Sequence, residues 1–97
     1  MSYAVTVDFE ITAGDFDRFL ERVKIQASDS LQLEQGCLEF KVWTGSAQAG
    51  HVYLYEVYES AGAFQEHLQS RHFKQFDAEV AGWILSKKVE CWDSPAA

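Results

Sequence analysis

The sequence predicts one α+β domain in which helical segments and four strands follow one another in the order βαββαβ. Three observations support this prediction. Apolar residues alternate with polar ones in short segments, they recur at three- and four-residue steps in the segments between, and turn-forming residues separate the two periods. A chain of 97 residues fits a single domain, with a core over about 3–92 and a tail over 93–97.

The first strand and the first helix are predicted from a change of period. Apolar and polar residues alternate over 3–11, which predicts a strand. Apolar residues then recur at helical spacing over 15–34, and Thr12 or Asp15 is expected to cap the start of that helix. Gly36 is expected to adopt the left-handed conformation that often follows a helix.

A hairpin is predicted next. Residues 37–43 form its first strand, the small and polar residues 44–50 form the loop, and residues 51–58 form its second strand. The second strand, HVYLYEVY, is apolar on both faces, so we place it in the middle of the sheet. One face of the first strand is expected to carry Leu38, Phe40 and Val42.

The rest of the chain predicts helical structure followed by a last strand. A short helix over 60–69 has Ser60 as its cap, residues 70–81 form a second helix or its continuation, and residues 83–92 form the strand. Two right-handed crossovers of this kind build a ferredoxin-like, four-stranded antiparallel sheet with its helices on one face. The other face must then be covered in another way.

The composition suggests how that face is covered. Hydrophobic residues make up 47% of the chain and aromatic residues 14%, which is more bulky apolar surface than a small core buries. We therefore predict a homodimer that packs sheet against sheet, or a ligand pocket, or both.

Charge and cysteine content exclude several classes of function. A net charge of −7 argues against nucleic acids and anionic membranes as partners. The two cysteines, Cys37 and Cys91, have no metal-binding spacing and are expected to be free thiols. No signal peptide or membrane-spanning stretch is found, so the expected location is the cytoplasm.

Three segments resemble a known family when taken together. Residues 35–40 (QGCLEF) resemble the turn and strand "PGCL.Y/F", residues 53–58 (YLYEVY) resemble the strand "lyEvY", and residues 63–74 (AFQEHLQSRHFK) resemble the helical segment "af..H..s.Hf" of antibiotic-biosynthesis-monooxygenase domains. The resemblance runs from about Tyr3 to Trp92. It implies the dimeric ferredoxin-like α/β-barrel fold and an apolar pocket for a small organic substrate.

The family's members differ widely in chemistry, so individual residues must be considered. The five-residue separation of His67 and His72 resembles the branch of quinol oxygenases and autoinducer-2-processing enzymes. The haem-degrading branch would have Trp at position 67 and His at about position 77, where this chain has His67 and Asp77. The resemblance therefore disfavours haem as a cofactor. If the protein is an oxygenase, the mechanism consistent with the sequence is activation of the substrate without a cofactor, with O₂ as co-substrate.

The candidate catalytic residues are His67, His72 and Glu56. A histidine titrates near neutral pH and can accept the proton of a phenolic hydroxyl. Five residues turn an unbroken helix by roughly 500°, so only one imidazole would face the pocket unless the helix breaks near Ser70. We favour His67, and a structural or surface role for each histidine stays open.

Glu56 interrupts an otherwise apolar strand, and burying its carboxylate would be costly without a partner. It is either a pocket base or an orienter of a histidine, or else it makes a structural hydrogen bond or a salt bridge in the dimer, to Arg71 or a lysine for example. The structural role is slightly favoured.

The candidate substrate-binding residues are aromatic, with core or interface packing as their ordinary alternative. They are Trp43, Tyr53, Tyr55, Phe64 and Trp83. The sequence shows no metal-binding spacing, phosphate loop or nucleotide fingerprint.

Three readings of function follow. The leading one is a cofactor-independent monooxygenase of quinols or phenolic, polyketide-like molecules. The second is an isomerase or degrading enzyme for a small phosphorylated signal, for which Arg71 and Lys74 would bind the phosphate. The third is a dimeric binding module without catalysis, which a pocket filled by its own side chains would favour.

Overall fold

The computed structural model describes residues 2–97 and has the predicted order of elements. Short 3₁₀ turns lie at Ala13–Asp15 and Ala81–Trp83. The strands and α-helices of the described residues are β1 (Tyr3–Ile11), α1 (Phe16–Leu33), β2 (Cys37–Trp43), β3 (His51–Tyr58), α2 (Ala61–Gln69), α3 (Arg71–Val80) and β4 (Ile84–Trp92).

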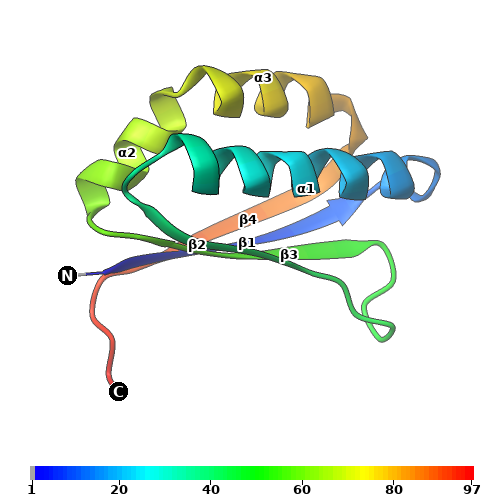
Figure 1. The fold of residues 1–97 in the computed structure, drawn as a ribbon. Helices are drawn as coiled ribbons and strands as arrows, with labels where there is room; N and C mark the ends of the chain where they lie inside the picture. Colours follow the sequence, from blue (N-terminus) through cyan, green and yellow to red (C-terminus); the bar gives the residue numbers. More distant parts are fainter. Residues whose placement is uncertain (1) are drawn as a thin grey trace.

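The four strands form one antiparallel sheet in the order β2-β3-β1-β4. All three α-helices of residues 2–97 cover the same face of this sheet, and the opposite face carries none (Figure 1). The ferredoxin-like α+β fold predicted from the sequence is confirmed, including the central position of β3.

The core lies between the sheet and the helices. The inward residues of β1 are buried, from Val5 at 0% exposure to Val7 at 5%, as their alternation predicts. The ring of Phe9 packs on Phe19 of α1 with 4.9 Å between centroids, and Phe76 of α3 lies beyond it. Burying such side chains contributes about 1.5–3 kcal/mol each.

The predicted inner face of β2 is wrong at one residue. The pairing of β2 with β3 shifts its register between Cys37 and Glu39, so Leu38 is the extra residue of a bulge. Leu38 is 50% exposed, while Cys37 and Phe40 are both buried. Simple alternation cannot reveal a bulge, because the bulge shifts the period by one residue.

The two predicted ends of helix α1 also differ from the structure. Neither Thr12 nor Asp15 accepts a side-chain capping hydrogen bond, and a backbone bond from Asp15 N to Thr12 O closes the first turn instead. Gly36 is not left-handed, since Gly50 is the one glycine of positive φ among the described residues. The chain leaves α1 through an extended Glu34.

A close approach of helix α2 explains why residue 36 is a glycine. A Cβ atom placed there would lie 2.7 Å from Cβ of Ala63, at the start of α2. Carbon atoms normally stay about 3.5–4.0 Å apart. The glycine therefore lets α2 approach the turn that follows α1, close to the residues considered below.

Gly36→Ala is expected to lower the free energy of unfolding by about 1–3 kcal/mol, because backbone has to move to relieve the contact with Ala63. Chemical denaturation would measure it. Gly14→Ala is the matched control, because nothing lies within 4 Å of its Cβ position. Equal stability of both variants would contradict the steric explanation.

Candidate functional site

A break between two helices places the two candidate histidines. Helix α2 ends at Gln69 and α3 begins at Arg71, with Ser70 extended between them at ψ 147°. The Ser70 hydroxyl caps α3 by accepting from Phe73 N. The break brings the His67 and His72 rings to 6.0 Å between centroids. This is the break near Ser70 that the five-residue spacing required if both imidazoles are to meet.

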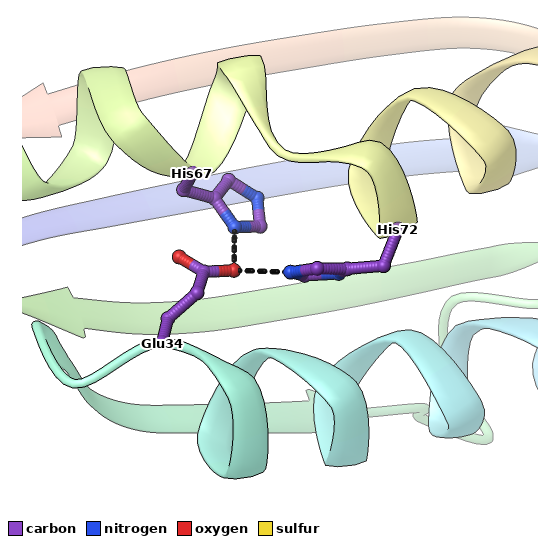
Figure 2. Close-up of side chains that lie close together, drawn as sticks. All are labelled: Glu34, His67 and His72. Atoms are coloured by element: carbon purple, nitrogen blue, oxygen red, sulfur yellow. Dashed lines mark hydrogen bonds and ion pairs between the residues drawn. The ribbon is translucent and has the colours of Figure 1, made fainter.

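Both histidines converge on Glu34, the residue that follows helix α1. Oε2 of Glu34 lies 2.8 Å from Nδ1 of His67 and 2.7 Å from Nε2 of His72. Figure 2 shows both rings directed at this one carboxylate oxygen. All three side chains are nearly buried, at 3–13% exposure. Sequence analysis missed Glu34, since a glutamate at a helix end has no pattern that marks it as buried.

The bond to Glu34 determines the state of His67. A carboxylate only accepts hydrogen bonds, so Nδ1 of His67 carries the proton. The free nitrogen of the neutral ring is then Nε2, which points away from Glu34 (Figure 2). Burial lowers the pKa of His67, and the neighbouring Glu34 carboxylate partly opposes this shift. His67 is therefore a neutral imidazole with a lone pair on Nε2.

The surroundings of His72 are different. Its Nε2 lies 2.7 Å from Oε2 of Glu34, an ion-pair contact rather than a regular hydrogen bond. Its Nδ1 lies 3.2 Å from Nε2 of Gln26, a buried residue of α1. His72 does not line the cavity described next, whereas His67 does.

A cavity of about 220 Å³ lies between the sheet and helices α2 and α3. A dry cavity of about 150 Å³ holds benzene, so one or two fused rings would fit here. The cavity adjoins β4, where its lining residue Val89 is 46% exposed. Most of the lining is apolar, and its polar members are Gln26, Glu56, His67 and Lys87.

Glu56 lies in this wall with a structural partner. The Tyr58 hydroxyl donates to its Oε1 at 2.6 Å, and the side chain is 3% exposed. Burial raises the pKa of Glu56 to about 7. The hydrogen bond that sequence analysis favoured for Glu56 is thus made to Tyr58, and the orienter of His67 is Glu34.

Glu56 should make stability depend on pH. Its pKa rises from 4.5 to about 7 on folding, so it stabilises the fold below pH 4.5 and that stability is lost as pH rises through 7. The loss corresponds to roughly 3 kcal/mol. Denaturation across pH 4–8 should show wild type losing stability relative to Glu56→Gln. Parallel curves would contradict the buried, protonated carboxyl.

Only one of the predicted substrate-binding residues lines the cavity, namely Phe64. Tyr53 and Tyr55 alternate along β3 with the inward Leu54 and Glu56, so they lie on the sheet face that carries no helix. The same is true of Trp43, which pairs with Tyr53. Trp83 lies under the guanidinium of Arg18 at 4.7 Å. These four aromatic side chains are not part of the cavity.

Other residues of the cavity were not singled out in the sequence. Val5, Val7 and Phe9 line it from β1, and Lys87 lines it from β4. The two cations predicted to bind a phosphate, Arg71 and Lys74, are exposed and do not line it. Alternation of the strands marks the β1 residues as inward, but not as cavity rather than core.

The site also has one group of donors that could hold a metal. The ligand atoms of Glu34, His67 and His72 all lie within 4.8 Å of one another. The thiols are not part of it: Cys37 is buried with its pKa raised to about 12 by that burial, and Cys91 is exposed.

None of the helices described is long and apolar enough to span a membrane.

Comparison with known proteins identifies the family. The sequence model described as antibiotic biosynthesis monooxygenase matches residues 2–79, most of the chain. The chain belongs to the antibiotic biosynthesis monooxygenase family. The resemblance read from the three sequence segments is thereby confirmed at the level of the family, and a general monooxygenase-like role is supported. No curated protein matches the chain.

Solved structures agree with this family fold. A candidate antibiotic biosynthesis monooxygenase from Nitrosomonas europaea superposes with a TM-score of 0.91 at 19% identity, over 98% of this chain and 91% of that one. Rv0793 from Mycobacterium tuberculosis gives 0.90 at 19% identity, over 100% and 98% of the two chains. A conserved protein from Methanosarcina mazei gives 0.90 at 16% identity, over 98% and 94%. These likenesses, at 16–19% identity, show a shared fold.

Proposed function

We propose that this antibiotic biosynthesis monooxygenase family protein oxidises a quinol or another phenolic, polyketide-like small molecule with O₂ and without a cofactor. His67 is the proton acceptor. The observation that carries the proposal is the position of His67: its Nδ1 is held by Glu34, and its ring lines an apolar cavity of about 220 Å³.

The first step is the transfer of the phenolic proton to Nε2 of His67. The resulting phenolate gives one electron to O₂, which a neutral phenol does poorly, and the two radicals combine at a ring carbon. Loss of water from the hydroperoxide leaves a carbonyl. For a hydroquinone with a free ring C–H, the products are a hydroxyquinone and one water, so each oxygen atom of O₂ is accounted for.

The cavity supports this chemistry in two ways. Its apolar wall strengthens the interaction of the Glu34 carboxylate with the imidazolium that forms on His67, because charges interact more strongly away from water. Its two other ionisable side chains, Glu56 and Lys87, can hydrogen-bond to or attract an anionic oxygen. Glu56, with a pKa of about 7, is available as a donor near neutral pH.

The test is oxygen uptake with a panel of hydroquinones and anthrones, using metal-free protein. Substrates of one or two fused rings should be consumed faster than larger ones, and ¹⁸O₂ should label the product with one atom and water with the other. The proposal would be overturned if no member of the panel caused oxygen uptake at protein concentrations high enough for a single turnover to be detected.

A homodimer is part of the same proposal. The sheet face without helices carries exposed aromatic side chains, among them Trp43 at 58%, Tyr53 at 42% and Trp92 at 53% exposure. Exposing so much aromatic surface to water is unfavourable, and the sheet of a second copy would cover it.

Tyr55→Asp is expected to shift the protein from dimer to monomer, because it places a charge in the middle of this face. Sedimentation equilibrium at micromolar concentration measures the state. Ile25→Asp, on the exposed side of α1, is the control and should stay dimeric. A wild-type monomer would contradict the predicted dimer.

A further inference from the structure

We propose that Glu34, His67 and His72 also bind one divalent transition-metal ion of the zinc class. The binding itself follows from the geometry of these three residues. A bound ion would also prevent His67 from accepting a proton. This consequence for the reaction rests on the function proposed above.

The three residues form a suitable ligand set. Two imidazole nitrogens and one carboxylate oxygen come from three elements, namely the residue after α1, helix α2 and helix α3. Their donor atoms lie within 4.8 Å of one another (Figure 2). Two histidines and one carboxylate bind Zn²⁺ in enzymes that leave the fourth position open, and Fe²⁺ in another class. Burial at 3–13% exposure would hold the ion away from competing water.

The surroundings of His72 and Gln26 give further support. Nε2 of His72 is directed at Oε2 of Glu34, 2.7 Å away, and Oε1 of Gln26 is buried without a hydrogen bond. A half-turn of the Gln26 amide would exchange its oxygen with the nitrogen that now lies 3.2 Å from Nδ1 of His72. Nδ1–H of His72 would then donate to a carbonyl oxygen, the usual support of a metal-binding histidine.

That arrangement leaves the Nε2 lone pair of His72 facing the Glu34 carboxylate at 2.7 Å. A separation this short needs a positive centre between the two atoms, which is either a proton on Nε2 or a bound metal ion, and a metal ion can take the place of that proton. Ligands of one tetrahedral zinc ion are about 3.3 Å apart, as follows from bonds of about 2.0 Å. The side chains must therefore move apart by roughly half an ångström, which rotation about their side-chain bonds can supply.

Metal binding would change the tautomer of His67. When Nδ1 binds the ion, the ring proton moves to Nε2, and Nε2 can no longer accept a proton from a substrate. Zinc is therefore expected to inhibit the oxygenation proposed above, with no metal-dependent activity required.

The binding test uses the full chain, freed of metal by a chelator. Isothermal titration with Zn²⁺ should give one ion per chain, and Co²⁺ should give the intense visible absorption of a tetrahedral site with histidine ligands. Gln26→Met should weaken binding by about 10–100-fold, and His72→Ala should weaken it further. His51→Ala is the matched control, since His51 pairs with a different carboxylate, Asp8, at 2.9 Å, and should bind as wild type does.

If His72→Ala fails to fold, judged by its circular dichroism, His72→Gln replaces it. Absence of Zn²⁺ binding by wild type, or binding that His72 and Gln26 variants do not weaken, would overturn the metal site.

Activity then separates the two proposals. We compare the ratio of oxygen-uptake rates with and without Zn²⁺ for each variant. Wild type should lose most of its rate, while the ratio for His72→Ala should move toward one. Zinc binding by a protein that oxidises no phenol refutes the oxygenase and leaves the metal site standing. Phenol oxidation that Zn²⁺ does not inhibit refutes the exclusion between the metal ion and the base.

Discussion

Replacing His67 by alanine is expected to lower kcat for oxygen uptake by about 10²–10⁴-fold, the usual contribution of a positioned general base. His67 is the ring whose Nδ1 is fixed by a carboxylate and whose edge lines the cavity. Without it, the phenolic proton has no neutral acceptor near the ring, and the anion that reduces O₂ forms too rarely. KM should change little, since the wall is mostly apolar.

Two measurements distinguish this loss from simple misfolding. Added imidazole should restore part of the rate to His67→Ala, because the truncation leaves room in the cavity for a small base. His51→Ala serves as the control: this half-buried histidine also lies beside a carboxylate, 2.9 Å from Asp8, but not at the cavity. A His67→Ala protein that turns over as fast as wild type would refute the base assignment.

Much of the fold was predictable because its signals are local. Alternation over β1 and helical spacing over α1 each follow from a side chain's nearest neighbours in the chain. The failures are at places where a distant residue decides. Gly36 is required by the approach of Ala63, and Leu38 is displaced by the pairing of β2 with β3.

The candidate site was predictable only in part, for the same reason. His67 and Glu56 stand out in sequence because a polar residue on an apolar face needs an explanation, and both line the cavity. Glu34 gives no such signal, because it follows the helix and is buried only when α2 and α3 pack over it. Tyr53 and Tyr55 lie on the sheet face without helices and outside this cavity, because aromatic content alone does not tell which sheet face adjoins a cavity.

Glu34→Gln is expected to lower kcat by up to about 10⁴-fold, as removing the charge beside a catalytic imidazole does elsewhere. Glu34 is a positioning residue that acts through His67, 2.8 Å away. A glutamine keeps the shape of the side chain, but its NH₂ group can donate to Nδ1. The ring proton is then driven onto Nε2, the nitrogen that must accept a proton from the substrate.

The tautomer of His67 can be measured directly, and it would not change if Glu34 had a purely structural role. Nitrogen-15 NMR of the imidazoles should show His67 protonated on Nδ1 in wild type and shifted toward protonation on Nε2 in Glu34→Gln. Glu34→Asp should recover part of the rate because it restores the charge, and Glu66→Gln, an exposed change on α2, should behave as wild type. A Glu34→Gln protein with the wild-type tautomer and a wild-type rate would mean that the carboxylate only fills space. The paired carboxylate is what turns a buried histidine into a directed base, so the tautomer and the rate should change together.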